Sequence, residues 1–298
     1  MTSIVEAEAL EKRYGDVHAV RGVSFDIAAG TCIGLLGPNG AGKTTTMRML
    51  MGLTRPSAGR VRVFGKPIAE LGRSFRMRIG LVPQDDNLDP DLTVRQNLDV
   101  YGRYFGIATA TLTARVPLLL EFMQLGERGD AKVMQLSGGM KRRLVIARSL
   151  IADPELIVLD EPTTGLDPQA RVLIWRRVLD LKRQGKTLLL TTHYMDEAQR
   201  LCDRIIVIDA GRILDVGTPQ ELIARHVAGH VFEIAKPVPD GVLPDALERE
   251  DIGDAILVYT AEPSALRDRL PAEIDYIHRA ANLEDVFLRL TGRRLRNE

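Results

Sequence analysis

The sequence predicts an α/β fold: a large domain on a mixed sheet with an antiparallel edge and a helical subdomain, then a small C-terminal α/β domain. Three observations support this. Short strand-like runs joined by turns fill the first residues, apolar runs alternate with helical stretches after residue 31, and the composition shifts near residues 228–241. Strands that alternate with helices favour a mostly parallel sheet covered by those helices.

The antiparallel edge is predicted from runs of strand-forming residues bounded by turns, at residues 4–14, 19–30 and 59–65. The parallel sheet is predicted from apolar runs beside helical stretches. These runs are TCIGLL (31–36), LIVLD (156–160), TLLLTT (187–192) and RIIVIDA (204–210).

A helical subdomain is predicted over residues 85–145, approximately. Thr93 can cap a helix, and Val94, Leu98, Tyr101 and Phe105 then fall on one face of it. That spacing is typical of a helix packed on a core.

The second domain is predicted over residues 229–298, after a first domain of residues 1–228. HVFEIA, DAILVYTA and IDYIHRA favour strands, and SALRDRL and NLEDVFLRLTG favour helices. In the last helix Asn282 can act as the cap, and Leu283, Val286, Phe287 and Leu290 form an apolar stripe. No catalytic pattern stands out in this domain, for which we expect dimer support or regulation.

Composition narrows the class of protein. Lys and Arg number 40, as do Asp and Glu, so the formal net charge is zero, which argues against nucleic acid as the main partner. The start lacks the pattern of a signal peptide, and no apolar run approaches the roughly 20 residues that span a bilayer. We expect a soluble chain whose membrane role, if any, comes from a partner, with Cys32 and Cys202 as buried thiols.

GPNGAGKT (37–44) fits the phosphate-loop pattern G-x-x-x-x-G-K-[ST] and lies between a predicted strand and a predicted helix. Glycines let backbone N–H groups surround phosphates, Lys43 can reach the β- and γ-phosphates, and the Thr44 hydroxyl can bind Mg²⁺. The predicted nucleotide-binding residues here are Gly37, Pro38, Asn39, Gly40, Ala41, Gly42, Lys43, Thr44 and Thr45.

LIVLDEP (156–162) supplies acids beside that loop. A buried strand delivers Asp160, a candidate Mg²⁺ ligand, and Glu161 follows as a candidate to orient or deprotonate a water molecule. His193 ends the next apolar strand, from which it could approach the γ-phosphate. Gln84, after another strand, is ambiguous alone, and so is Tyr14, which could stack on adenine or merely pack.

LSGGMKRR (136–143) is a second candidate anion site, because Ser137, Gly138 and Gly139 precede a helical pattern and helix N-termini attract anions.

Phosphate loop, glutamine, LSGGM, LIVLDEP, GLDP and histidine, in this order, resemble the ATP-binding subunits of ABC transporters over about residues 4 to 225. The resemblance implies a P-loop NTPase of ABC type that hydrolyses ATP with Mg²⁺. It implies that Tyr14 stacks on adenine and that Gln84 touches Mg²⁺ and senses a membrane partner. With Lys43, Glu161 and His193, Gln84 completes the predicted catalytic set.

The resemblance also implies a head-to-tail dimer with ATP sandwiched between one subunit's phosphate loop and the other's LSGG segment. Ser137, Gly138 and Gly139 would then bind the nucleotide held by the partner copy, and Asp167 of GLDP would belong to the loop that crosses between subunits. The usual signature ends in glutamine, and this chain departs from it with Met140.

Within the transporters, residues 82–106, the block at 136–168 and the tail NLEDVFLRLTG are most similar to exporters of the nodulation-signal and daunorubicin-resistance type. This implies a peripheral ATPase at the cytoplasmic face of the inner membrane. It would drive export of a lipo-oligosaccharide-like or drug-like molecule through a separate transmembrane permease. The alternative is a non-transport ATPase of the family that acts on nucleic acid or ribosomes. The small helical insert and the single cassette argue against it.

Overall fold

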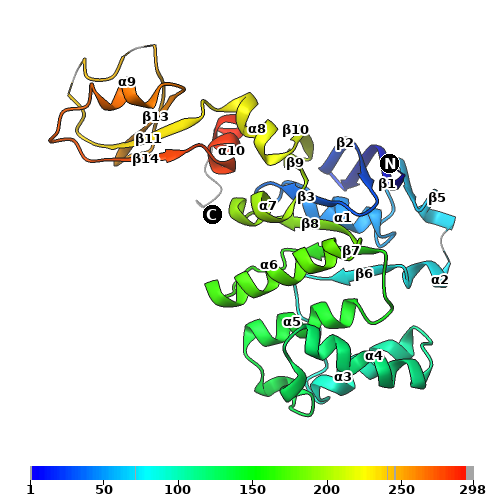
Figure 1. The fold of residues 1–298 in the computed structure, drawn as a ribbon. Coiled ribbons are helices and arrows are strands. Elements are labelled where there is room, and N and C mark those ends of the chain that lie inside the picture. Colours follow the sequence, from blue (N-terminus) through cyan, green and yellow to red (C-terminus); the bar gives the residue numbers. More distant parts are fainter. Residues whose placement is uncertain (1, 71, 240, 245, 293–298) are drawn as a thin grey trace. The chain divides into compact units, whose positions relative to one another are not determined.

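A computed structural model describes residues 2–70, 72–239, 241–244 and 246–292 (Figure 1). The chain divides into two compact units, Met1–Leu214 and Asp215–Glu298. This division falls before helix α8 (Pro219–His226), whereas the predicted domain boundary at 228/229 falls after it. The roles assigned to the two domains stay predictions.

The predicted antiparallel edge is present in the first unit. Its sheet has the strand order β2-β1-β4-β5, with β1 (Ser3–Tyr14), β2 (Val17–Ala28), β4 (Ala58–Val63) and β5 (Lys66–Pro67). The β1–β2 hairpin closes at the pair Tyr14 and Val17, and Gly15 between them has a φ of 56°. Glycine adopts this left-handed conformation without steric cost, which suits a tight hairpin turn.

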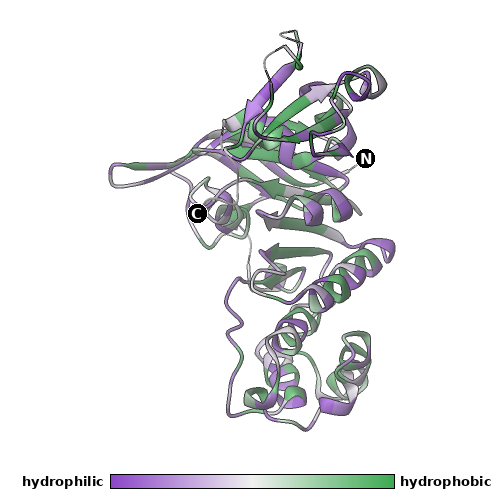
Figure 2. Cartoon of the chain, turned by 90° about the vertical axis from the view of Figure 1, so that its left-hand side faces the viewer, coloured by the Kyte–Doolittle hydropathy of each residue, from purple (hydrophilic) through white to green (hydrophobic). Residues whose placement is uncertain are grey.

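A second sheet of the first unit carries the predicted parallel strands, in the order β10-β9-β3-β8-β7-β6. Within this order, the adjacent strands from β9 to β6 pair in parallel. The chain-order bounds are Cys32–Leu36 (β3), Ile79–Val82 (β6), Leu156–Asp160 (β7), Thr187–Thr192 (β8), Arg204–Asp209 (β9) and Arg212–Gly217 (β10). Every residue of β3, β7 and β8 is buried, and Figure 2 shows hydrophobic residues along the central strands. The carboxyl ends of these parallel strands meet at one edge of the sheet.

Helix α1 (Lys43–Leu50) follows β3, α6 (Pro168–Arg183) connects β7 to β8, and α7 (Met195–Leu201) connects β8 to β9. Figure 1 shows the three helices packed along the sheet. Asp167 caps α6, because its Oδ1 accepts a hydrogen bond from the Ala170 N–H at 2.9 Å. Two short helical pieces, η1 (Ile68–Glu70) and α2 (Arg73–Arg76), precede β6.

The helical region contains α3 (Val94–Tyr104), α4 (Thr109–Phe122), η2 (Gly126–Arg128), η3 (Val133–Gln135) and α5 (Gly138–Ser149). Thr93 forms the predicted cap of α3, completed by Gln96 into a capping box. Val94 and Leu98 are fully buried, which confirms the predicted apolar face, and the Tyr101 ring packs edge-on against Phe105 with centroids 5.3 Å apart.

The second unit holds α8, β11 (His230–Ala235), β12 (Glu248–Asp251), β13 (Ala255–Thr260), α9 (Pro263–Arg267), β14 (Tyr276–Ala280) and α10 (Leu283–Thr291). Its antiparallel sheet has the order β12-β13-β11-β14. Phe232, Val258 and Leu266 are central to its core. Asn282 caps α10 as predicted, since its side chain accepts from two backbone N–H groups. Strand β12 consists of the charged residues ERED and was not predicted.

Across the described ranges, every helix is too short or too polar to cross a bilayer.

Candidate active site

The loop at residues 37–42 joins β3 to α1 in a conformation that depends on glycine. Gly40 and Gly42 have φ angles of 79° and 98°. A Cβ on Gly37 would lie 2.1 Å from the Ile208 carbonyl oxygen, and one on Gly42 would lie 2.6 Å from that of Ala19. The loop therefore closes tightly around the start of α1, where backbone N–H groups can surround an anion.

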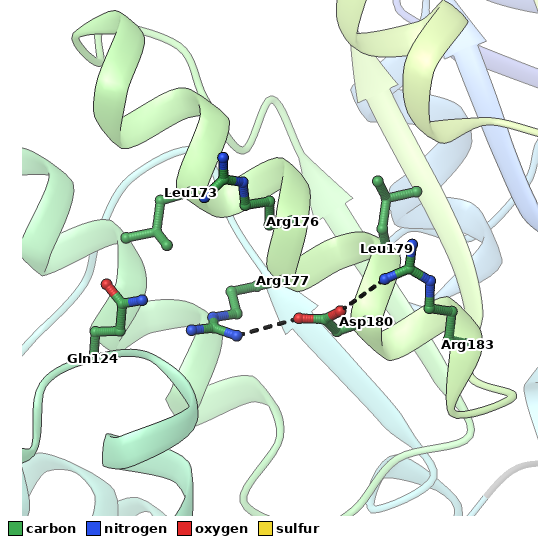
Figure 3. A pocket seen from close by; sticks show the side chains of 7 residues that line it. All are labelled: Gln124, Leu173, Arg176, Arg177, Leu179, Asp180 and Arg183. Atoms are coloured by element: carbon green, nitrogen blue, oxygen red, sulfur yellow. Dashed lines mark hydrogen bonds and ion pairs between the residues drawn. The ribbon is translucent and has the colours of Figure 1, made fainter.

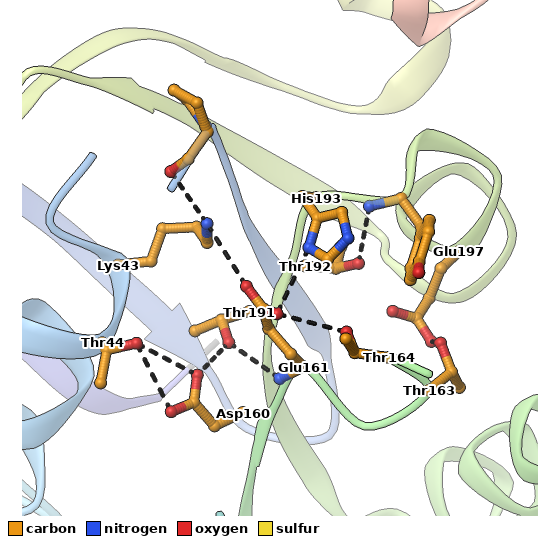
Figure 4. A network of polar contacts seen from close by, with 12 residues as sticks. Lys43, Thr44, Asp160, Glu161, Thr163, Thr164, Thr191, Thr192, His193 and Glu197 are labelled. Atoms are coloured by element: carbon orange, nitrogen blue, oxygen red, sulfur yellow. Dashed lines mark hydrogen bonds and ion pairs between the residues drawn. The ribbon is translucent and has the colours of Figure 1, made fainter. Parts of the chain in front are cut away.

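Lys43, the first residue of α1, is buried with 5% of its side chain exposed. Its Nζ donates hydrogen bonds to the carbonyl oxygens of Gly37 (2.8 Å) and Pro38 (3.0 Å). The same Nζ lies 3.6 Å from Glu161 Oε1 (Figure 4). Burial lowers the pKa of Lys43, while the Glu161 carboxylate opposes that shift. Polar groups thus hold this ammonium inside the loop, where a phosphate would replace them.

Asp160 ends β7 beside Thr44, the second residue of α1. The Thr44 Oγ1 lies 3.4 Å from Asp160 Oδ1, and the Thr191 hydroxyl donates to the same oxygen at 2.5 Å (Figure 4). Burial raises the pKa of Asp160, and the Thr191 hydrogen bond opposes this. A hydroxyl and a carboxylate are oxygen ligands of the kind that Mg²⁺ prefers.

Glu161 has a left-handed backbone, with φ at 45°. Its N–H donates to the Thr191 carbonyl oxygen (3.0 Å) and to Thr191 Oγ1 (3.1 Å), so β8 holds this turn in place. A left-handed non-glycine residue costs on the order of 1–3 kcal/mol and persists only where neighbours fix it, a pattern that is concentrated at functional sites.

The Glu161 side chain lies between several partners and is only 9% exposed. Its Oε2 accepts from the Thr164 hydroxyl (3.2 Å) and lies 3.3 Å from His193 Nδ1. The hydrogen bond with His193 contributes most to lowering the pKa of Glu161. Burial opposes this shift, and the positive charge of Lys43 adds to it. The carboxylate is therefore ionised at neutral pH and aimed at the phosphate loop.

The structure thus brings Lys43, Thr44, Asp160, Glu161 and His193 together, as the sequence pattern predicted. Thr191 and Thr164 were not predicted as site residues; their hydroxyls donate to Asp160 and Glu161, respectively. In the sequence, the feature that could have indicated Thr191 is the pair of threonines that ends the otherwise apolar run TLLLTT.

Gln84 and Tyr14 make no side-chain contact with this cluster in the described part of the chain. Gln84 is exposed two residues after β6, whose pairing with β7 places it at the same sheet edge as Asp160. Tyr14 is 49% exposed at the end of β1, with Lys12 Nζ 4.9 Å from its ring centre. Their roles stay predictions.

Ser137, Gly138 and Gly139 lie apart from the cluster. Ser137 is the N-cap of α5, where its Oγ accepts from the Met140 N–H at 3.3 Å. A Cβ on Gly139 would lie 2.8 Å from Ala170 Cβ, so this glycine also permits the close approach of α5 and α6. No hydrogen bond or ion pair among the described residues joins Ser137 to the phosphate loop of its own chain.

A separate hollow of about 310 Å³ lies along α6 and is lined by Gln124, Leu173, Arg176, Arg177, Leu179, Asp180 and Arg183 (Figure 3). Asp180 accepts from Arg177 and Arg183, each at 3.2 Å. None of the predicted site residues lines this hollow, and its ion pairs are those of a solvated helix face.

The phosphate-loop cluster has the parts that nucleotide hydrolysis requires: glycine-shaped backbone and a buried ammonium for phosphates, oxygen ligands for Mg²⁺, and an ionised carboxylate beside them. The donor set therefore fits Mg-ATP.

Comparison with known families agrees with this chemistry. Residues 20–164 match the family described as "ABC transporter", and residues 244–292 match "Nodulation factor export protein NodI, C-terminal domain". The chain is 52% identical to "Nod factor export ATP-binding protein I" of Paraburkholderia xenovorans (strain LB400), over 98% of both chains. It is 51% identical to the protein of that name in Cupriavidus metallidurans, over the full length of both.

Solved structures agree on the fold. One is cbiO1 from Clostridium perfringens, part of the ABC transporter complex cbiONQ, at 31% identity and a TM-score of 0.70, with 75% of this chain and 92% of that chain covered. Another is a dimeric bacterial ABC transporter cassette, at 28% identity and a TM-score of 0.66, with 72% and 98% covered. The predicted ABC-type fold is confirmed, and a nucleic-acid ATPase is not favoured. The chain belongs to the ABC transporter family, as the ATP-hydrolysing subunit of an exporter.

Proposed function

We propose that the phosphate-loop cluster is the ATP hydrolysis site and that its residues have the roles predicted above. The observation that carries this proposal is the buried contact of Lys43 with Glu161, beside Asp160 and His193. Lys43 exchanges its contacts with Gly37, Pro38 and Glu161 for phosphate oxygens. Residues 37–45 bind the phosphates, and Tyr14 stacks on adenine.

Glu161 orients the attacking water and accepts its proton, and His193 lowers the pKa of this carboxylate and holds it in place. Thr44 and Asp160 would hold Mg²⁺, and Gln84 would be a further ligand of the same ion. The ion neutralises charge on the phosphates when it is bound.

The active unit is a head-to-tail homodimer with two ATP molecules. In the described ranges, no hydrogen bond or ion pair joins Ser137 or Gly139 to the phosphate loop of the same chain, which supports a role at the nucleotide of a second copy. The dimeric cassette structure among the relatives also supports it. Met140 takes the place of the glutamine of the usual signature, and Asp167 belongs to the crossing loop.

The dimer drives a separate transmembrane permease through the Gln84 region, peripheral to the cytoplasmic face of the inner membrane. The relatives named for Nod factor export support an amphipathic cargo, a lipo-oligosaccharide. The domain at residues 229–298 supports the dimer or regulates it.

The cargo is tested by purifying the chain with its permease in lipid and measuring ATP hydrolysis with added compounds. A lipo-chitooligosaccharide should stimulate hydrolysis at least severalfold, while the same oligosaccharide without its acyl chain should not. Stimulation by an unrelated hydrophobic drug alone would contradict the proposed cargo and leave the ATPase assignment standing.

A further inference from the structure

Arg142 lies in α5, on the helix that Ser137 caps, and only 4% of it is exposed. Its guanidinium has five N–H donors, and each has a main-chain carbonyl oxygen to bind. Nε donates to Pro162 (2.7 Å), Nη1 to Pro83 and Gln84 (3.2 Å to the latter), and Nη2 to Asp160 (2.9 Å) and Glu161 (3.1 Å).

This complete set of hydrogen bonds explains how a positive charge is tolerated inside the protein. A buried charge without partners is costly, and here carbonyl dipoles replace water around every donor. The closest carboxylate oxygen paired with it is Asp86 Oδ1, 3.9 Å from Nη1. Arginine alone among the side chains presents five donors in one plane, so neither lysine nor glutamine can reproduce the arrangement.

The acceptors come from two chain segments. Both lie at the edge of the parallel sheet that carries Asp160 and Glu161, here called the reactive edge. Pro83 and Gln84 directly follow β6, and residues 160–162 end and follow β7. Two of the five acceptors belong to the acids of the site, Asp160 and Glu161. Arg142 therefore ties α5 to the loop that carries the acids and to the loop that carries Gln84.

The neighbouring residue, Arg143, has different hydrogen-bond partners from Arg142. Arg143 Nη1 donates to the carbonyl oxygens of Met123 (2.7 Å) and Gln124 (3.0 Å), which follow α4. Two adjacent arginines of one helix thus bind different places: Arg143 binds within the helical region, and Arg142 binds the reactive edge.

We propose that Arg142 is a positioning residue that couples the two ATP sites of the dimer. This inference rests on the proposed head-to-tail dimer, in which the N-terminus of α5 meets the nucleotide of the second copy. A shift of α5 on that nucleotide moves the Arg142 guanidinium, which displaces the main chain at Glu161 and Gln84 in its own site. Linkage makes this coupling reciprocal, so ATP in either site favours closure at the other.

The test compares Arg142→Lys and Arg142→Gln with the control Arg143→Lys. The Gln variant is neutral and buries no charge, so it keeps the test available if the Lys variant does not fold. Three quantities are measured for each: the Kd of the isolated chain for a fluorescent ATP analogue, kcat for ATP hydrolysis, and the Hill coefficient for ATP.

The wild-type Hill coefficient should approach about 2, the number of sites in the dimer, and both Arg142 variants should bring it toward about 1. Their kcat should fall roughly ten- to a hundredfold, since small displacements of reacting groups have effects of this size. Their Kd should change less than about threefold, equivalent to about 0.7 kcal/mol. Arg143→Lys should match the wild type in all three.

An Arg142 variant that loses kcat but keeps the wild-type Hill coefficient would overturn the coupling, because a purely structural role predicts that result. The proposed dimer would then still stand. A wild-type Hill coefficient of 1 would contradict both the coupling and the cooperative dimer.

Discussion

The substitution Glu161→Gln tests the two proposed roles of this carboxylate, as the general base for hydrolysis and as the ion-pair partner of Lys43. The change removes a negative charge and keeps nearly the same shape, so the Thr164 hydroxyl can still donate to the remaining side-chain oxygen. We expect turnover to be lost while ATP binding is kept.

The expected changes in rate and in ATP affinity follow from these two roles of the side chain. Loss of a general base costs about 10²–10⁴-fold in rate, or roughly 3–5 kcal/mol. The attraction between Lys43 and Glu161 at 3.6 Å is about 5 kcal/mol before desolvation is subtracted, with an effective dielectric constant of about 20. ATP must displace this contact to reach the ammonium, so its removal should leave ATP affinity unchanged or raise it.

The assay is steady-state phosphate release, with equilibrium binding of a fluorescent ATP analogue measured in parallel. Glu155→Gln is the matched control, because Glu155 precedes the same strand and its carboxylate binds the exposed Arg78. The control should hydrolyse ATP at the wild-type rate. A Glu161→Gln protein with near-normal hydrolysis would refute the assignment of Glu161, and one that loses ATP affinity tenfold would refute the displacement argument.

Three further predictions concern neighbouring features. Ser137→Arg should stop hydrolysis and leave the Kd of the isolated chain for the ATP analogue unchanged; a lost affinity would place Ser137 at its own subunit's nucleotide. Gly139→Ala should lower the free energy of unfolding by about 1–3 kcal/mol in a denaturant titration, because its Cβ meets Ala170 at 2.8 Å; unchanged stability would show that α5 and α6 separate freely. Because burial raises the pKa of Asp160, this carboxylate takes up a proton earlier than an exposed aspartate as pH falls, so the Mg²⁺ concentration for half-maximal hydrolysis should rise on acidification. Asp160→Asn should abolish that dependence, and an equal shift in this variant would assign it to another group.

Spacing predicted the parts of the site that lie close together in sequence. The phosphate loop is a contiguous segment, and the strands that end at Asp160 and Thr192 are apolar runs with clear limits. Parallel pairing of these strands then brings their carboxyl ends to one edge without further information. The small strand β12 was missed because its residues ERED are charged and mostly exposed, so it has no hydrophobic alternation.

Other features depend on contacts between residues that lie far apart in the sequence, and the spacing of residues within a motif does not predict such contacts. The left-handed backbone of Glu161 results from two hydrogen bonds to Thr191, which lies on another strand. The need for glycine at position 139 arises from Ala170 on the neighbouring helix. A basic residue in a helical pattern is usually solvated, so the sequence offered no reason to expect that Arg142 would be buried.

The acceptors of Arg142 are all main-chain oxygens, and this has a consequence for how the site can evolve. The contacts depend on the path of the backbone and on no side chain at those five positions. A substitution at position 84 that keeps the path of the backbone therefore leaves the guanidinium with all its partners. The tie between α5 and the two loops is therefore insensitive to the chemical type of the side chains at those five positions.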